Sequence, residues 1–253
     1  AIALKPLLAQ AYCNQAVALR ELKRPQESLA RFEQAIAIEP NPHLADAYNN
    51  RGNLLKELQH LHEALSDLNR AIELEPKMTD AYINRGNVEQ ELMQWEAAIQ
   101  SYRQALELDP QRADGYWNIA LLLLLLGQFE MGWQLYEWRW KLDGFSSHQR
   151  KFGAPLWLGE QDLQGKTILL HAEQGLGDVI QFCRYAEMVK ALGAKVILEV
   201  PQPLSELLQG LVGVDQWVTQ GNALPDHDFH APLMSLPLAF KTELDQIPCK
   251  LPY

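Results

Sequence analysis

The pattern of apolar and polar positions divides the chain into two parts. Up to residue 142 it predicts helices arranged as repeats, whereas from residue 166 short apolar runs alternate with helical segments. The second pattern is clearest around one glycine turn. An apolar run at 167–170, short enough for a buried strand, leads into the turn at 174–178, and residues 179–186 follow with helical spacing. Strand, glycine turn and helix together are typical of an α/β unit that binds ligands at the turn.

The first part repeats itself at a fixed interval. Pro40, Pro76 and Pro110 each follow an aliphatic and an acidic residue, and the last two prolines lie 34 residues apart. The first interval is two residues longer, which we assign to an insertion at 43–44. Small residues recur where two helices of a repeat must cross closely, because a large side chain would push the helices apart. They are Gly52 with Ala64, Gly86 with Ala98, and Ala71 with Ala105.

These residues resemble the tetratricopeptide repeat (TPR) family, whose period is 34 residues. The repeat units predicted are 9–42, 45–78, 79–112 and 113–142, and residues 1–6 resemble the closing helix of a preceding repeat, so we expect the chain to be part of a longer protein. The resemblance implies antiparallel helix pairs in a right-handed superhelix with a concave face. That face is expected to bind a protein or peptide partner.

One asparagine occupies the sixth position of each unit, on the helix that lines the concave face in this family. The four residues are Asn14, Asn50, Asn84 and Asn118. A row of carboxamides can donate to and accept from the backbone of an extended peptide without reading its sequence. The row resembles the asparagine ladder of the O-linked N-acetylglucosamine transferases. The alternative is that each asparagine only caps or bridges neighbouring helices.

The fourth unit departs from the pattern. Residues 121–126 are apolar on all sides, and aromatic residues crowd the following helix, namely Trp133, Tyr136, Trp138 and Trp140. A helix that is apolar all round must be buried all round. We therefore expect this unit to be enclosed between the repeats and the α/β part, with a groove for an aromatic ligand as the alternative. Residues 143–165, rich in glycine, serine and proline, are predicted to be a linker.

The remaining segments predict a partial Rossmann-like parallel α/β lobe at 166–253, so the fold class expected is α + α/β. Further strands are predicted at 195–200, 215–219 and 227–232, and the short strand at 215–219 is expected near a sheet edge. A short helix is expected at 203–211, and a helical turn at 233–240.

This part of the chain matches two phosphate-binding motifs only in part. Lys166 follows a glycine as in a P-loop, but it precedes the strand and lacks the earlier glycine. Gly175 and Gly177 match the first two glycines of the dinucleotide motif, but Ile180 stands at the third, and Glu199 is a weak candidate for the ribose-binding acid.

The distinctive residue of the turn is Asp178, at the start of the predicted helix. The helix dipole and free N–H groups stabilise a carboxylate there. A plain helix cap is one interpretation. Because the flanking glycines leave room for a substrate, a general base for a sugar hydroxyl is the other.

The segment 172–185, together with 193–200 and 232–240, resembles the heptosyltransferase-like glycosyltransferases, including bacterial members linked to TPR repeats. The resemblance covers about 156–253. It implies a two-lobed GT-B enzyme that needs no metal, with the acceptor in this lobe and a nucleotide-sugar donor in a second lobe. Asp178 then corresponds to the catalytic base, Gly175 and Gly177 face the donor phosphates, and Gln174, Gln181 and Arg184 are substrate-binding neighbours.

The second lobe is not among these 253 residues. We therefore expect no cofactor bound to this fragment and no sugar transfer by it alone. The alternative function is a non-catalytic TPR scaffold for protein–protein interaction with a degenerate α/β cap. An exposed Asp178 carboxylate beside a cleft favours the enzyme, and one covered by its own helix favours the scaffold.

Composition limits the other function classes. The formal net charge of −10 argues against a nucleic-acid partner, because phosphate binding needs a basic face. The longest apolar stretch is too short to span a membrane, and no signal peptide is visible. Cys13, Cys183 and Cys249 show no paired spacing, which favours a reducing, cytoplasmic environment. His227 and His230 would point to opposite faces of a strand, so no metal site is expected. His171 is predicted to be a hydrogen-bonded core residue, with assistance to the site as the alternative.

Overall fold

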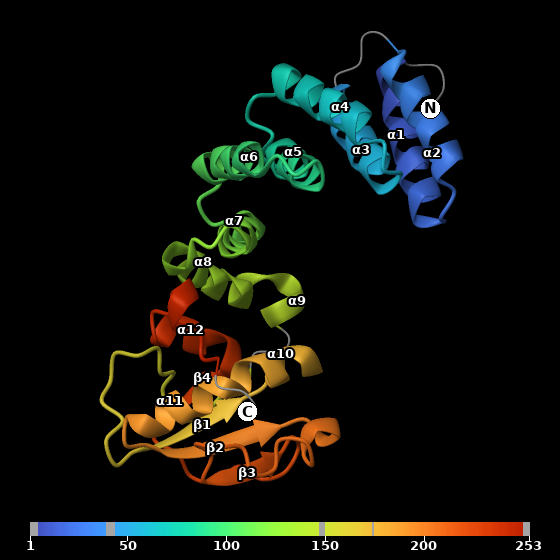
Figure 1. Ribbon diagram of the computed structural model, residues 1–253. Helices are drawn as coiled ribbons and strands as arrows, with labels where there is room; N and C mark the ends of the chain where they lie inside the picture. The colour runs from blue at the N-terminus through green and yellow to red at the C-terminus, as the bar shows by residue number, and fades with distance from the viewer. Residues whose placement is uncertain (1–4, 39–43, 147–149, 174, 250–253) are drawn as a thin grey trace. The chain divides into compact units, whose positions relative to one another are not determined.

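The computed structural model describes residues 5–38, 44–146, 150–173 and 175–249. It divides into two compact units, Ala1–Leu122 and Leu123–Tyr253. The division falls within helix α7 (Ala113–Leu125), whereas the sequence pattern placed the end of the repeats at residue 142. Figure 1 shows the helices and strands along the chain.

The first unit consists of antiparallel helix pairs, as the repeat pattern predicted (Figure 1). Helices α1 (Lys5–Glu21) and α2 (Pro25–Ile36) form one pair, α3 (Leu44–Glu57) and α4 (Leu61–Leu74) the next, and α5 (Thr79–Glu91) and α6 (Trp95–Leu108) the third. Helix α7 follows. Lys5 and Pro6 belong to the first turn of α1 and not to a closing helix, while residues 1–4 of that expected element lie outside the described residues.

Each helix pair is joined by the same tight turn. Lys23, Gln59 and Met93 adopt φ of 59°, 63° and 58°, and Gly127 adopts 75° at the equivalent place in the second unit. In the last of these turns, the Gln128 N–H donates to the Leu123 carbonyl at 2.8 Å. This left-handed residue with a hydrogen bond spanning six residues is a Schellman helix end, which satisfies the carbonyls left free by the last turn.

Small residues allow the two helices of a pair to approach closely, as the sequence predicted. A Cβ atom on Gly86 would lie 2.4 Å from Cε1 of Tyr102, which is itself fully buried. Ala64, Ala71, Ala98 and Ala105 are likewise fully buried. Side chains of this size therefore set the spacing between helices in the first unit.

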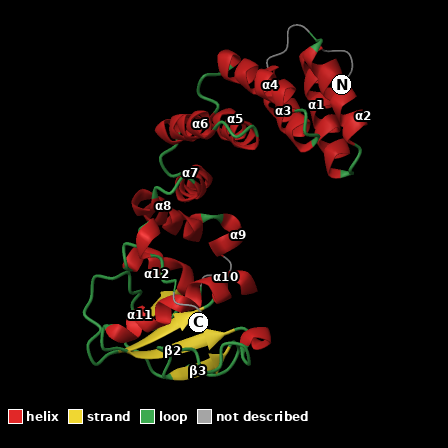
Figure 2. Cartoon of the chain, in the orientation of Figure 1, coloured by secondary structure: helices red, strands yellow, loops and turns green. Residues whose placement is uncertain are grey.

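The second unit contains a small parallel sheet (Figure 2). In the described residues its strands are β1 (Thr167–His171), β2 (Lys195–Val200), β3 (Gln216–Thr219) and β4 (Phe229–Pro232), in the order β3-β2-β1-β4. Leu169 of β1 lies opposite Ile197 of β2 and His230 of β4. The parallel pairing and the edge position of β3 confirm the prediction. Strands β1 and β2 are buried almost throughout, which explains why they read as continuous apolar runs.

Helices follow β1 and complete the packing of the sheet. They are α10 (Leu176–Phe182), the short 3₁₀ segment η2 (Cys183–Tyr185) and α11 (Ala186–Ala191), which packs against β2. The helix expected at 203–211 is reduced to a 3₁₀ turn, η3 (Gln202–Leu204), followed by hydrogen-bonded turns. Gly210, at φ 89°, ends this segment. A segment of this length is too short to form a stable helix of its own.

The predicted linker is part of the second unit over most of its length. Trp157 is 1% exposed, its N–H donates to the His230 carbonyl at 2.8 Å, and the His230 N–H donates to the Pro155 carbonyl at 3.1 Å. Residues 155–157 thus hydrogen-bond to the outer edge of β4, which would otherwise expose unpaired backbone groups. After α9 (Asp143–Ser146), the segment is not a free connection between domains.

The aromatic helix of the fourth repeat packs on the α/β part. Helix α8 (Phe129–Tyr136) contacts α12 (Leu236–Ala239), and the 3₁₀ segment η1 (Glu137–Lys141) continues it. The Tyr136 hydroxyl lies 3.7 Å from Met234 Sδ, and the Trp133 and Phe182 rings meet edge to face at 6.0 Å. The run 121–126, however, is not buried all round, because Leu125 is 65% exposed. Enclosure of the whole unit between the repeats and the α/β part stays a prediction.

Candidate functional site

The asparagine row lies on the first helices of successive repeats. Asn84 Nδ2 donates to Asn49 Oδ1 at 2.9 Å, which links α5 to α3. Asn118 Nδ2 donates to Asn87 Oδ1 at 3.2 Å, which links α7 to α5. These are the bridging contacts of the alternative interpretation.

The other two members of the row differ. Asn14 is exposed and accepts a hydrogen bond from Gln10 Nε2 at 2.9 Å within its own helix, and Asn50 is half-buried. A role for any of the four residues in peptide binding stays a prediction.

The partners of the row, Asn49 and Asn87, were not predicted. Both lie on first helices: Asn49 is one residue before Asn50, and Asn87 is three residues after Asn84. Residues three apart share a helix face. The sequence signal that could have predicted these two partners is the recurrence of asparagine close to the sixth position of a repeat.

The glycine turn is open, as expected, but its carboxylate is engaged by its own helix. Asp178 Oδ2 accepts a hydrogen bond from the Gly175 N–H at 3.1 Å, and Asp178 is half-buried. Gly175 and Gly177 are exposed, and a Cβ atom on Gly177 would meet no atom within 4 Å. This contact is that of a helix cap. Gln174, the first residue of the predicted turn, lies outside the described residues.

Gln181 and Arg184 line a small hollow that Asp178 does not line. It measures about 220 Å³, and half of its lining residues are aromatic, including Trp133, Phe182 and Tyr185. Arg184 Nη1 donates to the Pro248 carbonyl at 2.9 Å. The structure therefore does not bring these two residues together with Asp178 around one described cavity.

A larger cavity lies at the carboxyl ends of β1 and β4. From β1 the chain proceeds to β2 and β3 on one side of the sheet and then returns to β4 on the other. Ligands of parallel sheets bind at this kind of reversal, outside the carboxyl ends of the strands. The cavity has a volume of about 570 Å³ and is lined by Trp140, Arg150, Lys151, Phe152, Leu156, His171, Ala172, Glu173, His230 and Pro232.

Glu173 is the carboxylate of this cavity, two residues beyond the end of β1. Its side chain is 4% exposed, and its Oε2 accepts a hydrogen bond from Arg139 Nη2 at 3.0 Å. Oε1 lies 3.0 Å from the same nitrogen but makes no hydrogen bond in the described structure. Burial raises the pKa of Glu173 to about 7, against the lowering effect of Arg139.

Arg139 itself is fully buried and ties η1 to the sheet. Its Nη1 donates to Glu137 Oε1 at 2.7 Å and to the Tyr136 carbonyl at 3.2 Å. Its Nη2 also donates to Ser235 Oγ at 2.8 Å. The guanidinium thus compensates two carboxylates, as a buried cation must.

Two histidines form the inner wall of the cavity. His171 Nε2 lies 3.2 Å from His230 Nδ1, and the Phe152 ring packs on both, at 4.6 Å and 4.3 Å between centroids. Burial, with the neighbouring His230, lowers the pKa of His171 to about 3, and burial lowers that of His230 to about 4. Both rings are therefore neutral at pH 7. His171 is a core residue, as predicted, but it also lines the cavity.

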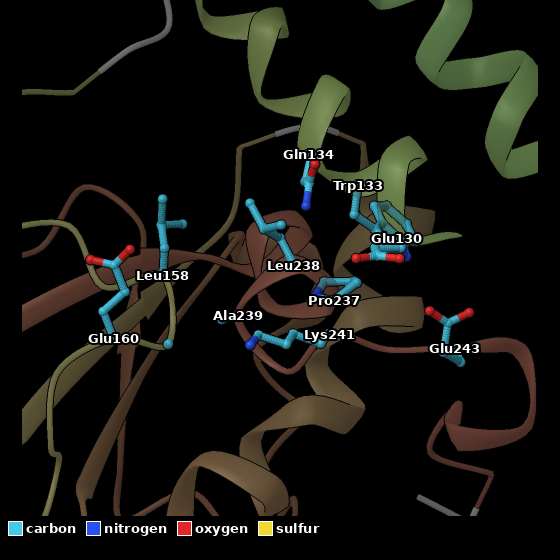
Figure 3. A pocket seen from close by; sticks show the side chains of 11 residues that line it. Glu130, Trp133, Gln134, Leu158, Glu160, Pro237, Leu238, Ala239, Lys241 and Glu243 are labelled. Atoms are coloured by element: carbon cyan, nitrogen blue, oxygen red, sulfur yellow. The ribbon is translucent and has the colours of Figure 1, made fainter. Parts of the chain in front are cut away.

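A further hollow of about 650 Å³ lies away from the strand ends, between α8, the loop at 158–160 and residues 237–243. Figure 3 shows Trp133 and Glu130 on one side of it and Leu158 and Glu160 on the other. Of its charged side chains, Glu130, Glu160 and Lys241 are exposed and Glu243 is half-buried. Nothing in this geometry indicates a particular ligand.

Family models match the repeats. A tetratricopeptide repeat model matches residues 9–42, another matches 45–78, and a TPR repeat model matches 91–127. The chain therefore contains tetratricopeptide repeats. No curated protein matches the chain.

Solved structures with similarity to the chain include TPR proteins. One is the first TPR of Spaghetti (RPAP3) bound to the HSP90 peptide SRMEEVD, with 21% identity over 50% of this chain and 98% of that chain, at a TM-score of 0.46. A second is a tetratricopeptide repeat protein from Parabacteroides merdae, with 19% identity over 55% and 54% of the two chains and a TM-score of 0.49. A third is MamA, with 19% identity over 51% and 75%, at 0.47.

In the part of the chain that the structure describes, no helix is long and apolar enough to cross a bilayer.

Proposed function

We propose that the repeats bind an extended segment of a partner protein along the face formed by their first helices. The observation that carries this proposal is the row of carboxamides on the first helices, two of which are held in place on α5 and α7. Asn84 and Asn118 are each held by one hydrogen bond to the preceding repeat, at 2.9 and 3.2 Å. Each carboxamide has two N–H donors and an oxygen acceptor, so one such bond leaves groups for a peptide backbone. A side chain held in advance loses less entropy on binding.

The experiment compares a double variant with a matched control. A peptide is first selected from a random library on the intact 253-residue chain, and its affinity is then measured for Asn50→Ala/Asn84→Ala by fluorescence anisotropy. We expect a Kd at least about tenfold higher, because each lost hydrogen bond contributes about 1 kcal/mol. Gln100→Ala, which removes an exposed carboxamide from the second helix α6, should leave the Kd unchanged. An unaltered Kd in a folded double variant would reject the proposal and leave only the bridging role.

We further propose that the α/β part contributes the acceptor side of a nucleotide-sugar transferase. The specific observation in its favour is the 570 Å³ cavity at the carboxyl ends of parallel strands, where the strand order reverses. In this hypothesis Asp178 is the general base, and Gln174, Gly175, Gly177, Gln181 and Arg184 are its substrate-binding neighbours. The donor pocket would come from a second lobe. The competing function is a binding scaffold whose α/β part has no catalytic role, and the engaged state of Asp178 fits that alternative.

Sugar transfer is tested on a chain that includes the native sequence downstream of Tyr253. Release of nucleotide from a panel of nucleotide-sugars is measured with and without the peptide selected above. We expect turnover by the extended chain, none by the 253 residues alone, and loss of at least about a hundredfold in Asp178→Asn. Near-normal turnover in Asp178→Asn would remove the residue from the base role. Absence of turnover in the extended chain would favour the scaffold.

A further inference from the structure

The cavity at the ends of β1 and β4 contains polar groups that protein packing alone does not explain. His171 is 4% exposed, and its Nδ1 has no hydrogen-bond partner in the described part of the chain. Glu173 Oε1 also lacks a hydrogen bond there, although it lies 3.0 Å from the Arg139 Nη2 with which the carboxylate is paired. Both side chains line the cavity. Buried polar atoms are almost always hydrogen-bonded, so atoms without such a bond, on side chains that line a cavity, point to a partner bound there.

The chemistry of these two groups selects hydroxyl groups as partners. His171 is neutral, and one of its ring nitrogens is a donor while the other is an acceptor. Glu173, with a pKa of about 7, is present in both its protonated and ionised forms near neutral pH. A hydroxyl group both donates and accepts, and so it satisfies either form. The aromatic and aliphatic walls, Trp140, Phe152 and Leu156, suit the carbon face of a ring.

The mouth of the same cavity is cationic. Arg150 and Lys151 are both exposed and line it, and Arg150 also pairs with the buried carboxylate of Glu199. Because Glu199 compensates Arg150, Lys151 supplies the remaining positive charge of the described lining, in a chain whose net charge is −10. A ligand with an anionic group at the mouth is therefore favoured over a neutral one.

We infer that this cavity binds a hydroxylated anion of monosaccharide size, such as a hexose phosphate. Glu173 and His171 hydrogen-bond to its hydroxyl groups, and Lys151 contacts its phosphate. The inference deepens the second proposed function by naming the ligand class of that lobe, and it moves the contacting carboxyl group from Asp178 to Glu173. It concerns binding alone, so it is tested on the 253-residue chain without any transfer reaction.

The test uses three kinds of probe. Glucose 1-phosphate, galactose 1-phosphate and mannose 1-phosphate are compared with the free hexoses and with inorganic phosphate, by saturation-transfer NMR and calorimetric titration. We expect at least one hexose phosphate to bind about tenfold more tightly than either its free hexose or phosphate. Binding of phosphate alone with equal affinity would reduce the site to an anion site and overturn the inference. So would the absence of binding by every hexose phosphate.

Two variants distinguish the contacts made to the phosphate from those made to the hexose. Lys151→Ala should weaken the hexose phosphate about fivefold or more and leave the free hexose unchanged. Glu173→Gln should weaken hexose phosphate and hexose by similar factors and leave inorganic phosphate unchanged. Lys166→Ala and Glu206→Gln, at exposed positions that do not line the cavity, are the controls.

Lys151 is exposed, so Lys151→Ala should fold. The test therefore remains decisive even if Glu173→Gln does not fold. Unchanged binding in folded Lys151→Ala places the ligand elsewhere. Hexose phosphate binding without sugar transfer in the extended chain would support this inference and reject the second proposed function.

Discussion

The repeat region and the α/β region differ in how deeply they bury a paired arginine. In the repeats, Arg51 donates to both oxygens of Asp67 at 2.6 and 2.8 Å, and the arginine side chain keeps 20% of its surface exposed. In the α/β region, Arg139 is fully buried between Glu137 and Glu173. The first pair joins two helices of one repeat, with Asp67 buried and Arg51 partly exposed. The second joins the 3₁₀ segment η1 to Glu173 in the wall of the cavity and to Ser235.

The largest expected effect is the loss of the buried cation. Arg139→Met leaves two carboxylates uncompensated, so we expect it to lower the free energy of unfolding by about 3–5 kcal/mol. Arg51→Met removes a partly exposed pair and should cost about 1–2 kcal/mol. Urea unfolding of both variants, followed by circular dichroism, measures the difference. Equal costs would mean that the contrast between the two regions has no energetic basis.

The second prediction concerns pH and Glu173. Its pKa in the folded protein, about 7, is above the ordinary value of 4.5, so the fold favours the protonated form. The folded state therefore binds more protons than the unfolded state between these values, and unfolding free energy falls as pH rises from about 4.5 to about 7. Relative to Glu173→Gln, the native chain should lose on the order of 2–3 kcal/mol over this window, at 1.36 kcal/mol per pKa unit.

Thermal unfolding at intervals of half a pH unit gives this difference directly. Contributions from His171 are common to both proteins and cancel. The matched control, Glu206→Gln, is exposed and should give a difference that does not depend on pH. A flat difference for Glu173→Gln as well would show that its carboxyl group is not buried as the structure has it.

The smallest effect tests a feature that the two regions share. Met93 in the first unit and Gly127 in the second adopt the same left-handed conformation, with φ of 58° and 75°. Because a non-glycine residue is strained there and Met93 is 73% exposed, Met93→Gly should raise stability by about 0.5–1 kcal/mol. Gly127→Ala should lower it by a similar amount. Differential scanning calorimetry resolves both changes, and shifts of the same sign would contradict the shared turn.

The repeats were predicted well because their information is local and recurs. The 34-residue period, the small residues at helix crossings and the asparagine positions are all visible without knowing what contacts what. The strands and their parallel arrangement were predicted for a similar reason, since a strand buried on both faces is a continuous apolar run. The segment at 155–157 was misread as a linker because its structure depends on the free edge of β4, about 75 residues later.

The candidate site was predicted only in part. The glycine turn drew attention to Asp178, yet that carboxylate bonds to its own helix at Gly175. Glu173 was passed over, although its place just beyond a strand end was a usable signal. The place of Glu173 in the cavity depends on its contact with Arg139, which lies 34 residues away in the chain. Arg139 also bonds to Ser235, which lies 96 residues from Arg139.

The sequence by itself determined the repeats, the parallel strands and the glycine turn, because periodicity, apolar runs and glycine act over a few neighbouring residues. Only the tertiary structure decided where the cavity lies, which carboxyl group lines it and which one is engaged by its own helix. The physical reason is that burial and pairing of Arg139, Glu173 and His171 arise from segments distant in the chain. Their desolvation, and with it their chemistry, exists only once those segments have packed together.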